Sequence, residues 1–220
     1  MMKLTWFEIT KGKVSQLMDE IKNHAFIKEL SDGSLDAKRF HFYMHQDSYY
    51  LNSYGKVLAS ISTQLKNPDH SLDFMGFATG TIVVEKALHK DFIEELKGFE
   101  QPEKSPTCVL YTGFLTEVNQ FDSIEVSLAA VLPCFWIYQE VGDYLLSIAN
   151  TDNNPYQKWM DTYGGEDFAN SVERVIEITE YYAKNTTPEV REAMTKAFLK
   201  TAQMEWMFWD SAYRLEKWPV

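Results

Sequence analysis

Proline placed directly after a helix-capping side chain is the sequence feature that most constrains the fold of this 220-residue chain. Ser105-Pro106 and Thr187-Pro188 each join a favourable N-cap hydroxyl to proline at the first helical position, where an N–H has no intrahelical partner anyway. Almost every segment between such boundaries has a helical pattern, and no segment shows the two-residue alternation of a strand or an internal repeat. The sequence therefore predicts an all-α bundle of seven or more helices.

The expected helices cover roughly residues 7–21, 24–30, 35–65, 72–96, 106–119, 123–148, 156–163, 167–183 and 188–215. We expect Ser34 to cap the third of these helices and Gly98 to end the fourth. The clearest loop covers residues 150–155. Because the loops are short and unlike linkers, residues 1–220 are expected to form a single helical domain.

The charge and cysteine content exclude several classes of protein. A formal net charge of −11 opposes sequence-independent binding to nucleic acid and to an anionic membrane surface. Two cysteines cannot form a disulfide framework, and the N-terminus lacks the apolar core of a signal peptide. No apolar run reaches the ~20 residues that span a bilayer. We therefore expect a soluble, cytoplasmic protein with no nucleic-acid or membrane partner.

A proline–cysteine pair lies inside the most apolar segment, residues 132–140. Pro133 either starts a helix or kinks one, and Tyr138 lies four residues after Cys134, on the same helical face. A free cysteine in a helical core is most often a small buried hydrophobe. Taken alone, this segment does not distinguish a packing cysteine from a reactive one.

Other polar side chains are embedded in apolar helices. Asp47, Tyr50 and Tyr54 lie at i, i+3 and i+7, so they share a helical face that is either solvent-exposed or buried and hydrogen-bonded. Glu205 is flanked by large apolar residues, which favours a raised pKa suited to acid–base chemistry, unless its head reaches water at the edge of the core. Tyr163 ends a short helix before two glycines, where its phenol could reach a pocket.

Metal and nucleotide sites are not indicated. The five histidines have no zinc-ligand spacing, and Glu85 and His89 do not have the Glu-x-x-His spacing of a di-iron bundle. His45 could ligate haem iron, but a lone helical histidine is usually structural. No dinucleotide or phosphate-binding glycine motif is present. We expect no cofactor.

Five ordered blocks of the sequence together resemble one family. They comprise His24-x-Phe26 to Leu35, Phe40-x-x-Tyr43-x-x-Gln46-Asp47-x-x-Tyr50-Leu51, Glu85-x-x-Leu88-His89 with Tyr111-Thr112, Leu132-Pro133-Cys134-x-Trp136-x-Tyr138-x-x-x-Gly142, and Trp159 to Phe168 followed by Glu205-x-x-Phe208-Trp209-x-x-Ala212-Tyr213. In this order they resemble the TenA family, known as thiaminase II or aminopyrimidine aminohydrolase, over nearly the whole chain. Because Cys134 is present, the resemblance is to the cysteine-containing branch.

The resemblance implies a haem-oxygenase-like bundle that binds no haem and commonly assembles as a homotetramer. It also implies hydrolysis at the methylene carbon attached to a 4-amino-2-methylpyrimidine ring. Thiamin would lose its thiazole, and 4-amino-5-aminomethyl-2-methylpyrimidine would lose ammonia. Both reactions give 4-amino-5-hydroxymethyl-2-methylpyrimidine, which thiamin salvage can use.

The same resemblance implies roles for individual side chains. The Cys134 thiolate would add to the pyrimidine ring and later be expelled. Glu205 would protonate a ring nitrogen and take the proton back. Asp47 would accept hydrogen bonds from the 4-amino side of the ring.

Five aromatic residues complete the implied site. Tyr50 and Tyr163 would hydrogen-bond near the leaving group and the attacking water, and Tyr138 would orient the thiol. Tyr111 and Phe208 would sandwich the flat ring.

Two alternatives to this enzyme remain open. A regulatory or binding protein could use the same pocket without turnover, although the chain keeps the cysteine, glutamate and aspartate that catalysis needs. An oxidative enzyme of the same fold could handle a quinone or haem, although the scattered histidines weigh against it. Cys108 has no surrounding motif and is expected to serve packing.

Overall fold

The computed structural model describes residues 4–88, 99–149, 153–163 and 165–220 of the chain, and within them it contains ten helices and no β-strand. The helices are α1 (Trp6–Lys13), α2 (Ser15–Lys22), α3 (Ala25–Asp32), α4 (Ala37–Gln64), α5 (Pro68–Leu88), α6 (Pro106–Phe121), α7 (Ile124–Ile148), α8 (Gln157–Tyr163), α9 (Glu166–Lys184) and α10 (Pro188–Arg214). The all-α prediction is confirmed.

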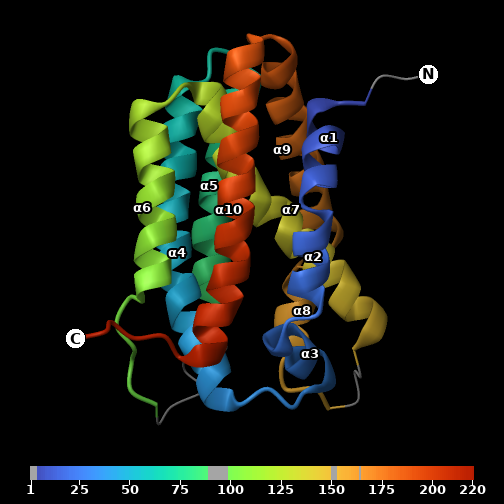
Figure 1. The fold of residues 1–220 in the computed structure, drawn as a ribbon, viewed down its shortest axis with the longest axis vertical. Coiled ribbons are helices and arrows are strands. Elements are labelled where there is room, and N and C mark those ends of the chain that lie inside the picture. The colour runs from blue at the N-terminus through green and yellow to red at the C-terminus, as the bar shows by residue number, and fades with distance from the viewer. Residues whose placement is uncertain (1–3, 89–98, 150–152, 164) are drawn as a thin grey trace.

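The long helices run side by side in an elongated bundle, with α4 and α6 along one side, α10 in the middle and the short α1 and α2 along the opposite side (Figure 1). Helix α4 packs most extensively against α5, and α7 packs most extensively against α10 and then against α9. The short α8 packs against α7 at the end of the bundle near α3. This arrangement brings together helices that are far apart in the sequence.

Helix α7 is the apolar centre of the bundle. Sixteen of its residues, including the whole run from Val126 to Tyr138, are buried. Its length and mean hydropathy of 1.3 would suffice to cross a membrane, which the sequence analysis did not anticipate, but 72% of its most apolar window is buried inside the structure. This extent of burial is that of a core helix, and the residues of α7 that are exposed lie in its C-terminal turns.

Local capping explains most of the helix boundaries. The hydroxyls of Ser105 and Thr187 accept hydrogen bonds from the backbone N–H groups of Cys108 and Val190, as the cap–proline pairs predict. Ser123 precedes α7 but makes no side-chain capping bond. The boundaries at 106 and 188 are therefore confirmed.

Three predicted boundaries were wrong. The helix expected over residues 7–21 is divided at Val14, whose φ of −108° and ψ of 11° interrupt the helical path two residues after Gly12. Asp36, and not Ser34, caps α4, since its carboxylate accepts from the N–H of Lys38 at 2.7 Å. Helix α5 begins at Pro68, four residues earlier than expected. The predicted end at Gly98 lies outside the described residues.

Helix α3 ends at Gly33, which adopts a left-handed conformation with φ of 78°. The Asn154 amide donates to the carbonyls of Leu30 and Ser31 at 3.0 and 3.1 Å, so the free carbonyls at the end of α3 are satisfied by the segment that leads into α8. This contact fixes the end of the bundle where α8 carries Tyr163.

Candidate active site

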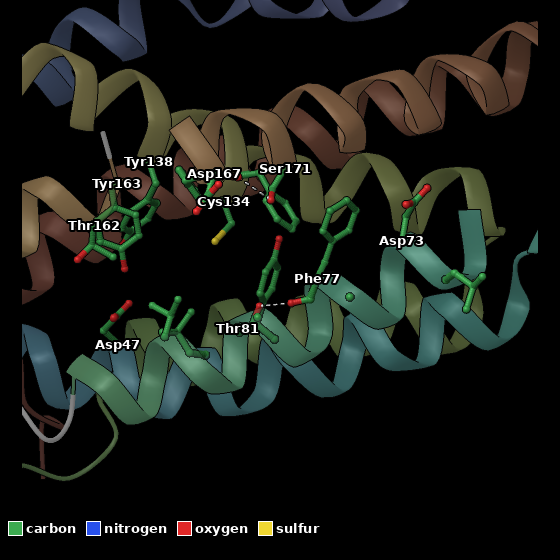
Figure 2. Close-up of a pocket in the computed structure, with 18 residues that line it drawn as sticks. Asp47, Asp73, Phe77, Thr81, Cys134, Tyr138, Thr162, Tyr163, Asp167 and Ser171 are labelled. Atoms are coloured by element: carbon green, nitrogen blue, oxygen red, sulfur yellow. Dashed lines mark hydrogen bonds between the residues drawn. The ribbon is translucent and has the colours of Figure 1, made fainter. Parts of the chain in front are cut away.

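A cavity of about 570 Å³ lies between α4, α5, α7, α8 and α9. Four of the predicted site residues line it, namely Asp47, Cys134, Tyr138 and Tyr163. Figure 2 shows the Cys134 sulfur pointing into this space, with Asp47 across from it and the two tyrosine rings side by side at one end. The rest of the wall is mostly apolar and comes largely from α5 and α9. It includes Leu51, Tyr54, Leu72, Gly76, Phe77, Gly80, Val84, Phe135 and Phe168.

Pro133 lies inside α7, one residue before Cys134. Proline has no N–H, so the helical hydrogen bond to the carbonyl of Ala129 cannot form in this turn. The thiol is 8% exposed. Burial, followed by the nearby Glu205 carboxylate, raises the pKa of Cys134 well above its ordinary value, and the Tyr50 and Tyr54 hydroxyls offset part of that rise. The resting group at neutral pH is therefore the thiol.

Glu205 on α10 is 1% exposed, so its head does not reach water at the edge of the core. The Tyr111 hydroxyl on α6 donates to its Oε1 at 2.6 Å. Burial raises the pKa of Glu205 to about 8, the Tyr111 hydrogen bond opposes this rise, and the Asp47 carboxylate adds to it. The side chain is mostly a neutral carboxylic acid at pH 7 and can give up a proton near neutrality.

Tyr50, Tyr111 and Phe208 form an aromatic group behind the cavity wall. The Tyr50 ring centroid lies 4.7 Å from that of Tyr111 and 5.7 Å from that of Phe208. None of these three residues, nor Glu205, lines the cavity. The buried Tyr50 hydroxyl has no hydrogen-bond partner among the described residues, although it lies close enough to Cys134 to lower the pKa of the thiol. The structure thus brings all eight predicted residues into one cluster, four on the cavity and four behind it.

Asp47 is 2% exposed, which excludes the surface position left open by the sequence. Its carboxylate raises the pKa of Tyr43, Tyr138 and Tyr163 in addition to their burial. An acidic oxygen therefore lies near three phenols at the same end of the cavity. A buried carboxylate here is suited to accept hydrogen bonds from an amino group.

Two tyrosines of this cluster received no role from the sequence. The hydroxyls of Tyr43 and Tyr138 lie 3.0 Å apart, and Tyr54 donates to the backbone carbonyl of Val131 at 2.7 Å. The spacing of Tyr54 from Asp47 already indicated a shared face. Their partners, however, lie 95 and 77 residues away in the chain, so no local pattern could reveal them.

The histidines do not gather at the cavity. The Nε2 atoms of His41 and His45 lie 3.2 Å apart on α4, and both rings are buried. Among the residues that the structure describes, no group of three or more potential ligands could hold a metal ion. His89 lies outside them.

The site thus combines a thiol and a carboxylate that open on an apolar cavity with a carboxylic acid that lies behind the cavity wall and exchanges its proton near neutrality. Flat apolar walls with few polar groups are typical of sites for small ring-shaped ligands. The thiol and the acid provide for addition to a ring and proton transfer to it.

Comparisons with known proteins agree with this geometry. A family model described as the TENA/THI-4/PQQC family matches residues 12–215. A protein of Bacillus subtilis (strain 168) named aminopyrimidine aminohydrolase is 38% identical over 199 residues, which cover 89% of this chain and 84% of that protein.

Two solved structures show the same fold. A TenA homologue from Pyrococcus furiosus superposes with a TM-score of 0.88 at 17% identity, covering 94% of this chain and 99% of that one. A domain from Shewanella denitrificans described as having a heme oxygenase-like fold gives 0.76 at 16% identity, covering 95% and 92%. The predicted haem-oxygenase-like bundle is confirmed, and the chain belongs to the TENA/THI-4/PQQC family.

Proposed function

We propose that this protein hydrolyses the bond between the methylene carbon of a 4-amino-2-methylpyrimidine and its leaving group, with Cys134 as nucleophile. Its product would be 4-amino-5-hydroxymethyl-2-methylpyrimidine, for thiamin salvage. The observation that carries the proposal is the cavity on which the Cys134 thiol and the Asp47 carboxylate both open, with the Glu205 acid close behind the thiol. The name of the 38% identical relative supports the substrate class.

The reaction begins with addition to the ring. Because burial keeps Cys134 as a thiol at neutral pH, its proton leaves as sulfur bonds to a ring carbon. Glu205, protonated at this pH, delivers its proton to a ring nitrogen, and its carboxylate takes up the proton that Cys134 loses, so the net result is addition of S–H across the ring. Asp47 accepts from the 4-amino group and sets the orientation of the ring.

Loss of aromaticity then allows the leaving group to depart, as ammonia or as the thiazole. Water adds to the methylene carbon and gives up a proton to the departed ammonia or to solvent. The carbon–sulfur bond then breaks, the ring proton passes to Glu205, and the proton held by Glu205 returns to the sulfur. Tyr138 and Tyr163 on the cavity wall hydrogen-bond near the water and leaving group. Tyr111 acts by holding Glu205, and Phe208 packs on Tyr50 beside the ring site, in place of the ring sandwich implied by the resemblance.

The cavity has room for a second ring. Leu72 and Val84 on α5 both line it, and at 1.5 Å per residue they are about 18 Å apart along the helix. Gly76 and Gly80 lie between them on the wall, and a Cβ at either position would meet no atom within 4 Å. Asp167, also on the wall, suits a cationic substituent. We therefore propose that both the aminomethylpyrimidine and thiamin enter. The name of the 38% identical relative favours the former as the preferred substrate.

Paired steady-state kinetics on the two substrates test this proposal. We expect ammonia release from 4-amino-5-aminomethyl-2-methylpyrimidine with kcat/KM at least ~100-fold above that for thiamin, and loss of both activities in Cys134→Ala. Cys108→Ala is the matched control, because Cys108 is fully buried outside the cavity and burial raises its pKa to about 12. A preference for thiamin would reverse the substrate order, and a Cys134→Ala variant as active as Cys108→Ala would exclude the mechanism.

The two alternative functions, a regulatory protein and an oxidative enzyme, predict different results in the same experiment. A regulatory protein would bind the pyrimidine with no turnover in the wild type. An oxidative enzyme would consume a quinone or haem and leave the pyrimidine intact. The retained thiol, acid and acceptor carboxylate around one cavity favour the hydrolase.

We also propose a single domain over residues 1–220, located in the cytoplasm and assembled as a homotetramer, with no nucleic-acid or membrane partner. Both cysteines are free, which suits a reducing compartment. The net charge of −11 opposes anionic partners. Exposed apolar side chains along α5 support self-association.

A further inference from the structure

We propose that Tyr54 is a positioning residue, whose side chain holds the proline-interrupted turn of α7 in place so that the Cys134 sulfur points into the cavity. Tyr54 lies on α4, two turns beyond Asp47, and is 2% exposed. The inference rests on the proposed role of Cys134 as the nucleophile.

The turn that carries Cys134 needs external support. Because Pro133 has no N–H, the carbonyl of Ala129 loses its helical donor, and proline inside a helix otherwise bends it. The sulfur therefore sits directly after the weakest turn of α7. Its direction depends on what packs against this turn.

Tyr54 contacts this turn at two points. Its hydroxyl donates to the carbonyl of Val131 at 2.7 Å, and its ring packs 5.9 Å, centroid to centroid, from the ring of Phe135. The same hydroxyl lowers the pKa of the Cys134 thiol and so offsets part of the rise that burial causes. The residues before and after the cysteine are thus both held by one side chain from another helix.

Tyr54 is itself held firmly. Its ring stacks on that of Tyr50 at 5.3 Å with an interplanar angle of 20°. Tyr50 in turn packs between Tyr111 and Phe208. A phenol fixed in this way can act as a rigid spacer between α4 and α7.

The hydroxyl proton of Tyr54 can form hydrogen bonds with two acceptors in turn, first a backbone carbonyl and then the cysteine sulfur. While Cys134 is a thiol, the proton is bonded to the Val131 carbonyl, and the oxygen lone pairs remain free to accept from S–H. When sulfur becomes a thiolate, the same proton can turn to the sulfur, and charge-assisted hydrogen bonds of this kind are the stronger ones. Removal of the hydroxyl should therefore affect both the direction and the acidity of the thiol.

Tyr54→Phe tests the inference, because it keeps the ring and removes only the hydroxyl. We expect kcat to fall at least ~10-fold with KM changed less than ~3-fold, and alkylation of Cys134 by iodoacetamide at pH 8 to slow about 10-fold. Peptide mass spectrometry separates alkylation of Cys134 from that of Cys108. The alkylation is measured without substrate, so it tests Tyr54 even if the wild type turns over no pyrimidine.

Tyr156→Phe is the matched control. Its hydroxyl also donates to a backbone carbonyl, that of Leu35, at 2.5 Å in a buried position, but it does not line the cavity. Both variants should lower the melting temperature by a similar amount, and only Tyr54→Phe should change kcat, the pH profile of alkylation and its rate. Equal alkylation rates in the two variants would overturn the proposal and leave Tyr54 a purely structural residue.

Discussion

Glu205 is buried at the centre of the site and keeps a proton that most glutamates have lost at neutral pH. Its pKa of about 8 lies above the ordinary value of 4.5, because burial disfavours the charged form. The stability associated with this proton is fully present below pH 4.5 and is lost as the pH rises through 8. Catalysis uses the same proton, so stability should decline between about pH 4.5 and 8, and activity should decline as the pH rises through 8.

Glu205→Gln tests this at the residue scale. Glutamine stays neutral and can still accept a hydrogen bond from Tyr111. We therefore expect the melting temperature of the variant to equal that of the wild type near pH 5 and to exceed it at pH 8.5. At pH 8.5 the unfolding free energy of the variant should be higher by about 1–4 kcal/mol. Turnover should fall at least ~100-fold, and wild-type kcat/KM should decline above about pH 8. Thermal denaturation across pH and pH–rate profiles provide the measurements.

Glu140→Gln is the control with the opposite sign. The pKa of Glu140 is lowered, despite the opposing effect of burial, by its hydrogen bonds and ion pairs with Lys11 and Lys22 and by the Trp136 N–H. The stabilisation that ionised Glu140 provides is present at neutral pH and lost as the pH falls. The free energy of unfolding of this variant should therefore be lower than that of the wild type at pH 7 and similar to it in acid. If both variants shift in the same direction with pH, the charge state assigned to Glu205 is wrong.

At the scale of a single element, the end of α3 depends on one backbone conformation. Gly33 has φ of 78°, and a Cβ at this position would lie 3.3 Å from the Pro155 ring. Gly33→Ala should therefore lower the unfolding free energy by about 1–2 kcal/mol. Gly12→Ala in α1 should have no such cost, because its Cβ would meet nothing within 4 Å and helix propensity improves. Chemical denaturation of both variants measures the difference, and equal losses would contradict the argument.

The helix boundaries show which elements a sequence can predict. The starts at Pro106 and Pro188 follow from their own caps, so local residues suffice. The break at Val14 follows Gly12 by two residues, but a single glycine inside a helical pattern is often tolerated, so the sequence alone did not predict a break there. Within the site, the resemblance predicted the residues of the cluster, but it could not predict that Tyr111 bonds Glu205 or that Tyr54 bonds α7, since these contacts join distant segments.

For the whole molecule, one exposed apolar face bears on assembly. Leu72, Met75, Ile82 and Val83 project from one side of α5 and are each 46–65% exposed. We expect a second copy of this chain to cover this face, because a monomer would leave a row of large apolar side chains exposed to water.

Val83→Glu should therefore convert the assembled protein to a smaller species in size-exclusion chromatography with light scattering. Phe121→Glu is the control, since Phe121 is 81% exposed at the end of α6, away from this face. A monomeric wild type, or equal dissociation by both variants, would contradict the assignment of the interface to α5. Activity of any dissociated form would show whether the cavity of one chain suffices.

The central position of α7 also has a consequence for synthesis of the chain. The helix that packs most extensively against it is α10, which leaves the ribosome after α7. Because translation proceeds at about 5–20 residues per second, the apolar surface of α7 stays uncovered for several seconds before α10 is synthesised. During that interval the nascent chain is a natural client for chaperones. A shortened chain that ends before α10 would carry this helix permanently exposed and should accumulate as aggregates, however well its other helices form.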